Sequence, residues 1–137
     1  MNTSQTLAST MLAAGAARYN GATLTFYSGA MPPSPETALS GNTAIAIFTF
    51  APTAFGAPTF TAPNAGIVAL FAGTTQPPLA AGTISFARAV ASDGVSALAD
   101  YTVGATGSGA DITIANPTVT LGVPVSLNSF TQMLPAV

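Results

Sequence analysis

Residues 82–103 have the sequence GTISFARAVASDGVSALADYTV and predict a β-hairpin. Two runs of alternating character flank Asp93-Gly94, and Asp-Gly between such runs favours a two-residue type I′ turn. Side chains of a strand point alternately to its two faces, so Arg88 shares the bulkier face of the first run with Phe86. The sequence therefore predicts a central hairpin that carries a charge where a hydrophobic core should lie.

The group that would neutralise Arg88 is open between two carboxylates. With a two-residue turn, Asp100 would lie opposite Ala87 and point to the other face of the hairpin. An ion pair between Arg88 and Asp100 therefore needs a bulge or a longer turn, whereas a pair with Asp111 needs only that a later strand lies close. Either carboxylate, or backbone carbonyl oxygens, would offset the desolvation of the guanidinium. We interpret Arg88 as structural and not as part of a ligand site.

The chain has 137 residues, enough for one domain with a core of its own. Only 4% of the residues are charged, against roughly 25% in an average domain. These residues are Arg18, Glu36, Arg88, Asp93, Asp100 and Asp111. Histidine and cysteine are absent, which removes the commonest general base and the usual nitrogen and sulfur ligands of zinc. We therefore expect no enzymatic activity, no catalytic residues, no metal and no cofactor.

The charge balance also limits the partners. Two arginines cannot form the basic patch that nucleic-acid binding requires. No run of about 18 apolar residues exists, so we expect no membrane-spanning helix. A freely diffusing monomer usually carries a mixed charged surface. We therefore expect other subunits to cover much of this surface, as in a homo-oligomer; the alternative is that threonine, serine, asparagine and exposed backbone supply enough polarity.

Residues 1–21 predict an N-terminal helix or arm that Asn20-Gly21 ends. Thr3 or Ser4 can cap it. Apolar side chains recur at helical spacing, and we take three of them as interface candidates: Leu7 and Met11, which form a stripe with Ala14, and Leu12, which widens it. The helix either closes one end of its own sheet or docks onto a neighbouring subunit.

Residues 22–137 predict an all-β domain, an antiparallel β-sandwich or a jelly-roll-like fold. The expected strands are 22–28, 43–51, 66–73, the two arms of the hairpin, 111–115, 118–121 and 125–134. Apolar residues occupy both faces of the second strand, which suggests that it is covered on two sides.

Two loops rich in proline interrupt the first strands. Residues 29–42 carry three prolines within four positions, which excludes a central strand there. Residues 52–64 predict a second loop, in which Phe55 and Phe60 are expected to anchor into the core or into a partner. Both phenylalanines are therefore interface candidates.

Several stretches, taken with the N-terminal helix, carry a resemblance to known proteins. They are LTFYSGAMP (24–32), FGAP (55–58), FARA (86–89) with SDG (92–94), residues 103–114 ending in GADITI, residues 119–122, and VSLNSFT (125–131). Together they resemble a family of short proteins encoded among the structural genes of tailed bacteriophages. The resemblance spans most of the chain, with gaps in 59–64. The family usually has an aromatic residue directly before the arginine, where this chain has Ala87.

The resemblance implies a setting and no chemistry, because members of this family are known only as virion proteins. We expect a non-enzymatic virion structural protein assembled in the host cytoplasm, and specifically a capsid decoration (cement) protein that stabilises the head through subunit contacts. Its partners would be the major capsid protein or other virion proteins. Copies of the chain would form a homo-oligomer, with a trimer favoured because it suits the threefold points of a lattice.

Two other functions remain open in the same setting. The chain could be a tail or head–tail connector subunit. It could also be a receptor- or carbohydrate-binding module on the virion, which would expose aromatic side chains on one face.

Overall fold

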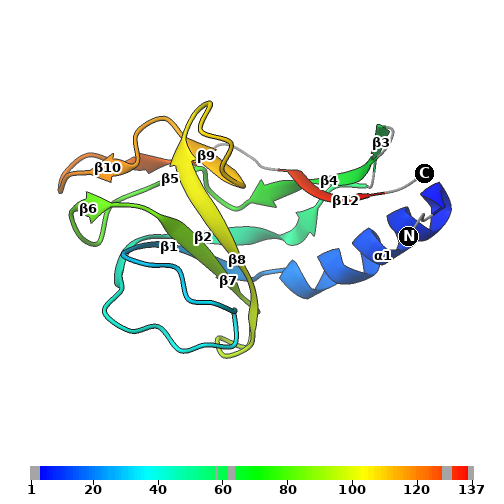
Figure 1. Cartoon of the computed structure of the whole chain (residues 1–137), viewed down its shortest axis with the longest axis horizontal. Helices are drawn as coiled ribbons and strands as arrows, with labels where there is room; N and C mark the ends of the chain where they lie inside the picture. The colour runs from blue at the N-terminus through cyan, green and yellow to red at the C-terminus, as the bar shows by residue number, and fades with distance from the viewer. Residues whose placement is uncertain (1–3, 58, 62–63, 128–130, 136–137) are drawn as a thin grey trace.

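The computed structural model describes residues 4–57, 59–61, 64–127 and 131–135. The described chain consists of β-strands preceded by one helix, and the strands form a curled sheet (Figure 1). The predicted all-β class with an N-terminal helix is therefore confirmed.

The elements follow the chain in this order. The helical segments are α1 (Gln5–Ala16) and the 3-10 helix η1 (Ala17–Tyr19). The strands are β1 (Thr23–Ser28), β2 (Thr43–Phe55), β3 (Thr59–Thr61), β4 (Asn64–Phe71), β5 (Thr75–Gln76), β6 (Gly82–Thr83), β7 (Phe86–Val90), β8 (Ala97–Ala105), β9 (Ile112–Ile114), β10 (Thr118–Val119), β11 (Val125–Ser126) and β12 (Thr131–Pro135).

The main sheet has eight strands in the order β12-β4-β2-β1-β7-β8-β9, with β3 also paired to β4. Two short ribbons, β10–β6 and β11–β5, lie outside it. Every described pair is antiparallel except β8–β9. This parallel pair departs from the antiparallel sheet that the sequence predicts.

The parallel pair forms because the chain turns back on itself within a few residues. The Asp111 carboxylate accepts hydrogen bonds from the backbone N–H and the hydroxyl of Thr102, at 3.0 and 3.1 Å. The strand after Asp111 therefore restarts beside Val103 and runs in the same direction. Gly104 permits this return, because a Cβ there would collide with Ser108.

Helix α1 packs against β4 of its own chain. This agrees with the prediction that the helix closes one end of its own sheet, the first of its two predicted roles. The Ser4 hydroxyl caps the helix by accepting a hydrogen bond from the Leu7 N–H. The buried face carries Ala8 and Leu12, whereas Leu7 and Met11 are about half exposed. Of the predicted apolar residues, Leu12 therefore lies on the buried face together with Ala8, and Leu7, Met11 and Ala14 lie on the exposed side of the helix.

One face of the sheet forms the main core. Leu24 and Phe26 from β1 and Phe48 and Phe50 from β2 are buried on it. The ring of Phe26 meets that of Phe48 edge-on, with ring centres 5.4 Å apart. On the other face of β2, Ile47 is 43% exposed, so the prediction that this strand is covered on both sides is wrong at that position.

The structure differs from the prediction in two further segments, the expected loop at 52–64 and the expected last strand at 125–134. Strand β2 continues to Phe55, and β3 and the start of β4 occupy part of the expected loop. The last predicted strand is divided into β11 and β12. Between 52 and 64, pairing with β4 outweighs the local proline signal. Strands β11 and β12 pair with different partners, β5 and β4.

The central hairpin forms, but with a longer connection than predicted. Residues 91–96 join β7 to β8. Gly94 has a positive φ of 76° and Asp93 does not, which excludes the type I′ turn. The Asp93 carboxylate instead accepts hydrogen bonds from the Val95 N–H and from the N–H and hydroxyl of Ser96. The longer loop comes with a register shift between Ala89 and Val90.

These hydrogen bonds, above all the one from the Ser96 hydroxyl, lower the pKa of Asp93 from 3.8 to about 2. The ionised form is favoured in the folded state, so its contribution to stability is complete above pH 3.8 and is lost as the pH falls through about 2. We expect an NMR titration of the Asp93 carboxyl to have its midpoint near pH 2. Ser96→Ala should raise that midpoint towards 3.8, and a wild-type midpoint already at that value would contradict the described loop.

Candidate functional site

Arg88 on β7 and Asp100 on β8 form a buried ion pair. The two residues are direct partners across the hairpin. Nε of Arg88 donates to Oδ1 of Asp100 at 2.7 Å, and Nη2 donates to Oδ2 at 2.9 Å. The side chains are only 7% and 5% exposed. The hydrogen bonds to Asp100 raise the pKa of Arg88.

The structure thus brings together two of the three predicted ion-pair residues. Arg88 pairs with Asp100 because the register shift and the longer turn put both on one face. Asp111 does not take this position in the described structure, since its carboxylate binds Thr102.

The same guanidinium holds residues 29–42, which we name the strap. Nη1 of Arg88 donates to the carbonyl oxygen of Thr37 at 2.8 Å, and Nη2 donates to that of Ser34 at 3.3 Å. Figure 1 shows the strap in cyan beside β1 and β7. The fork of one arginine therefore joins the hairpin to a segment about fifty residues earlier in the chain.

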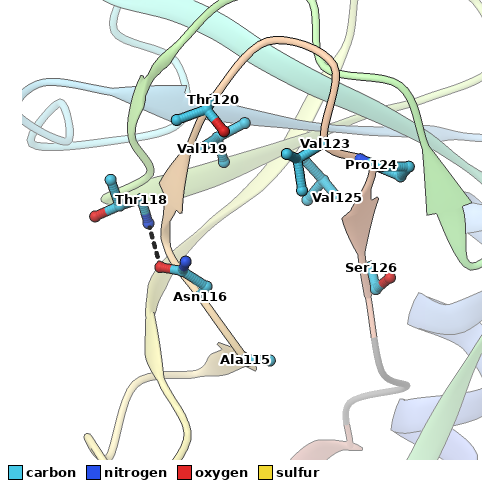
Figure 2. Close-up of a pocket in the computed structure, with 9 residues that line it drawn as sticks. All are labelled: Ala115, Asn116, Thr118, Val119, Thr120, Val123, Pro124, Val125 and Ser126. Atoms are coloured by element: carbon cyan, nitrogen blue, oxygen red, sulfur yellow. Dashed lines mark hydrogen bonds between the residues drawn. The ribbon is translucent and has the colours of Figure 1, made fainter.

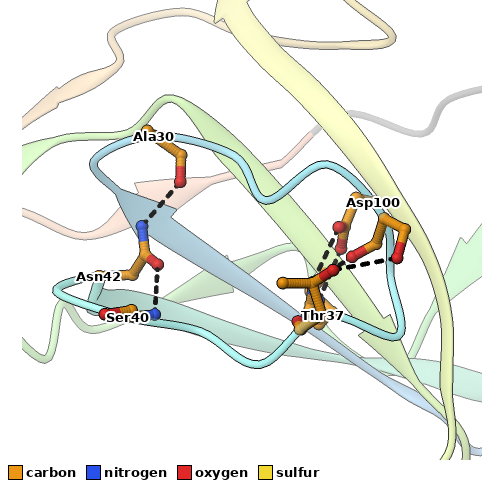
Figure 3. A network of polar contacts seen from close by, with 7 residues as sticks. Ala30, Thr37, Ser40, Asn42 and Asp100 are labelled. Atoms are coloured by element: carbon orange, nitrogen blue, oxygen red, sulfur yellow. Dashed lines mark hydrogen bonds and ion pairs between the residues drawn. The ribbon is translucent and has the colours of Figure 1, made fainter.

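Asn42 closes the other end of the strap (Figure 3). Its Nδ2 donates to the carbonyl oxygens of Ser28 and Ala30 at 3.1 and 3.0 Å. Its Oδ1 accepts from the N–H of Ser40. The strap is thus fixed at its neck by an asparagine and at its tip by Arg88. Nothing in the sequence alone singles out Asn42 for this role.

The strap covers the second face of the sheet over β1, β7 and β8. Phe86 lies on the same face as Arg88 and is fully buried, and its ring stacks on Tyr27 with ring centres 5.4 Å apart. Strap residues 35–39 line a common pocket with Tyr27 and Arg88. A small second core therefore lies between the strap and these strands.

The same face is uncovered over β2 and β4, and we name this part the open face. Ile47 shares the face of Arg88, because Thr25 pairs with both across the sheet. Ile47, Val68 and Leu70 are 43%, 41% and 46% exposed, whereas Ile67 is buried on the opposite side. None of the segments α1, β2 and β4 contains an ionisable side chain. The open face is an uncharged surface with large apolar side chains.

The predicted interface residues are divided between surface and core. Leu7 and Met11 are exposed on α1. Leu12 and Phe55 are buried within the chain itself, and for Phe55 the core was one of the two expected positions. Leu12 packs on the sheet one turn after Ala8, and the ring of Phe55 meets that of Tyr19 edge-on, with ring centres 5.2 Å apart. Phe60 lies in β3, and its side chain is outside the described part.

A surface pocket of about 370 Å³ lies between β10 and β11 (Figure 2). Its lining includes Asn116, Thr118, Val123 and Pro124 and contains no ionisable group. The Asn116 side chain is engaged, because its Oδ1 accepts from the Thr118 N–H at 3.1 Å. This pocket offers no acid, base or charged ligand for chemistry.

A further polar contact joins Tyr101, which is buried, to Tyr19, which is partly buried. The hydroxyls of Tyr19 and Tyr101 are 2.9 Å apart, and burial is the main cause that raises the pKa of each. Among the described residues no group of three or more acidic, histidine or cysteine side chains could hold a metal ion. No helix in the described ranges has the length and apolarity to span a membrane.

Comparisons with protein-family models, with curated proteins and with solved structures found no match.

We expect Arg88→Ala to lower the free energy of unfolding by about 3–5 kcal/mol, because it leaves Asp100 buried without a partner. Arg18→Ala is the matched control, since Arg18 is exposed, and should change stability by about 0.5 kcal/mol or less. Denaturant unfolding measures both. The double variant Arg88→Ala/Asp100→Ala should lose less than the sum of the single variants. Equal stability of Arg88→Ala and wild type would refute the pairing.

Proposed function

We propose that this chain is a non-enzymatic structural protein of a tailed-bacteriophage virion that decorates the capsid as a cement protein. The stretches that resemble virion proteins give the setting. The observation that carries the proposal is the open face, where Ile47, Val68 and Leu70 are exposed on strands without charge. Its partners would be the major capsid protein or other virion proteins, in a particle assembled in the host cytoplasm.

Contacts between virion subunits need complementary surfaces and no catalytic groups. A stable interface buries about 1,600 Å² in total, and its centre is depleted of charged residues. The open face has this composition, and the strap leaves it uncovered. Binding through apolar contact should also persist at high ionic strength, because salt screens only charges.

The distribution of aromatic side chains supports a structural role over a receptor- or carbohydrate-binding module. Such a module would present aromatic rings to solvent. Of the described aromatic side chains, none is exposed, and the rings of Phe26, Phe48, Phe50 and Phe86 are almost completely buried. A tail or head–tail connector subunit remains the second candidate, because an uncharged apolar face would serve there equally well.

The test is cosedimentation of the purified chain with empty heads, and separately with tails, of the phage that encodes it. We expect binding to heads that persists in about 1 M salt and raises the melting temperature of the shells. Leu70→Glu should weaken binding roughly tenfold or more, because a carboxylate on the open face loses hydration without gaining a partner.

Val95→Glu is the matched control, because Val95 is 84% exposed on the hairpin loop, away from the open face. It should bind like wild type. Thermal unfolding of each free variant checks that the fold is intact. Binding to tails alone would favour the connector role, and no binding to heads would remove the cement proposal.

A further inference from the structure

The strap lies on the sheet without becoming part of it. The structure describes all of residues 29–42, and none of them belongs to a strand or is buried. Three of them are prolines, which lack the N–H that a sheet ladder requires. No strap side chain belongs to the main hydrophobic core. A segment with few buried apolar contacts and no ladder hydrogen bonds opens at a lower free energy than the strands beneath it.

A single side chain holds the middle of the strap. Within 31–40, the hydrogen bonds from the strap to the rest of the described chain are those from Arg88 to the carbonyl oxygens of Ser34 and Thr37. Strap residues 35–39 also line a pocket of about 580 Å³ that extends to the hairpin loop. The middle of the strap is therefore loosely packed on the strands and depends on one guanidinium.

Opening of the strap would leave the ion pair intact. Arg88 and Asp100 both belong to the sheet, and the bonds from Nε and Nη2 of Arg88 to the carboxylate do not involve the strap. Removing the partner of a buried charge is costly, because the charge is left without compensation. When the strap leaves, Arg88 instead keeps its carboxylate, and water replaces the carbonyl oxygens of Ser34 and Thr37.

Glycines with positive φ lie at the two ends of the strap. Gly29 has a φ of 90° and Gly41 a φ of 72°. Glycine adopts such angles, and the more usual negative ones, with little steric cost. At Gly41 an added Cβ would meet no atom within 4 Å, so the backbone conformation and not the available space favours glycine there. Hinges are a few residues of this kind that absorb a large change in φ and ψ.

We propose that the strap is a hinged cover that opens as a unit about Gly29 and Gly41, while Arg88 stays paired with Asp100 on the sheet. Opening takes place in the folded protein and does not require the strands to separate. The closed strap then limits how much of the sheet face a partner can contact.

The covered area continues the open face. Thr25 pairs with both Ile47 and Arg88, so the three residues share one face of the sheet. Ile47 is 43% exposed, whereas Thr25 and Arg88 are 9% and 6% exposed. The cover therefore begins between β2 and β1, and opening extends the open face onto β1 and β7. This regulation rests on the proposed function: a capsid shell that contacts β1 and β7 binds the open form better and shifts the population towards it.

The experiment measures the labelling rate of an introduced thiol, which is unambiguous because the chain has no cysteine. Thr25→Cys places the thiol under the strap. Ala89→Cys is the matched control, since Ala89 is fully buried on the opposite face of β7, beside Arg88. Val95→Cys gives the rate of a free thiol, because Val95 is 84% exposed. Denaturant unfolding of each variant gives the rate expected from global unfolding alone.

We expect the thiol of Thr25→Cys to react more slowly than that of Val95→Cys, but at least about tenfold faster than global unfolding allows. The thiol of Ala89→Cys should react no faster than global unfolding. Labelling of Thr25→Cys at the rate of global unfolding would overturn separate opening. Labelling as fast as in Val95→Cys would also overturn the proposal, because the strap would then not cover this face.

Gly41→Ala tests the hinge. Alanine is strained at a φ of 72°, and the strain disappears when the open strap lets this residue rotate. Added to Thr25→Cys, it should speed labelling roughly tenfold. Gly107→Ala is the matched control: Gly107 has a φ of 87°, an added Cβ would meet no atom within 4 Å, and the residue lies between β8 and β9. It should leave the labelling of Thr25→Cys unchanged, and an equal effect of both alanines would overturn the hinge.

Cosedimentation with heads tests the regulation. Gly41→Ala should bind heads more tightly than Gly107→Ala, by up to the factor by which it increases opening. If Gly41→Ala opens more often and binds no more tightly, the regulatory role is overturned. If no variant binds heads, the result counts against the cement role, while labelling of the free chain still decides whether the strap opens.

Discussion

The rest of the structure depends on one buried guanidinium. Arg88 lies on a sheet face, and its burial is tolerated only if nearly every N–H finds an acceptor. Asp100 supplies two oxygens, and the carbonyl groups of Ser34 and Thr37 supply the rest. Meeting this demand requires the register shift in the hairpin and the position of the strap. Because the strap lies over β1, β7 and β8, the neighbouring strands β2 and β4 are left open on that face.

The three aspartates are engaged in intramolecular hydrogen bonds and do not supply free surface charge. Asp100 neutralises Arg88, Asp93 closes the hairpin loop, and Asp111 turns the chain back beside β8. Among the acidic residues only Glu36 lacks such a described structural bond, and it lies on the strap. The charged side chains therefore all lie outside α1, β2 and β4. This segregation explains how a chain with a folded core can still have large uncharged areas on its surface.

The sequence predicts the fold class better than the details of the surface. Alternation and turn signals identify β1, β2 and β4. The isolated position of Arg88 predicts a carboxylate or backbone carbonyl oxygens as its partner, and the structure supplies both. The prediction of a two-residue turn is wrong, because hydrogen bonds to the Asp93 side chain hold a longer loop in place of the backbone bonds of a tight turn. The sequence leaves the buried side of α1 open, because an alanine-rich helix gives little basis for choosing between the Leu7 and Leu12 sides. The exposure of Val68 and Leu70 was not predictable, since a continuous apolar run is also typical of a strand buried on both faces. Which half of a sheet a strap covers depends on contacts such as those of Asn42, which have no local signal.

The strap is held by main-chain oxygens at its tip, at Ser34 and Thr37, and by an asparagine at its neck. Carbonyl groups are common to all residue types, so the hydrogen bonds from Arg88 do not depend on which side chains the strap carries. Glu36 and Ala38 are exposed, and exchanging them should leave the acceptors of the guanidinium in place, because these are main-chain oxygens of Ser34 and Thr37. On a particle surface, such a segment could display many different short peptides on one unchanged scaffold.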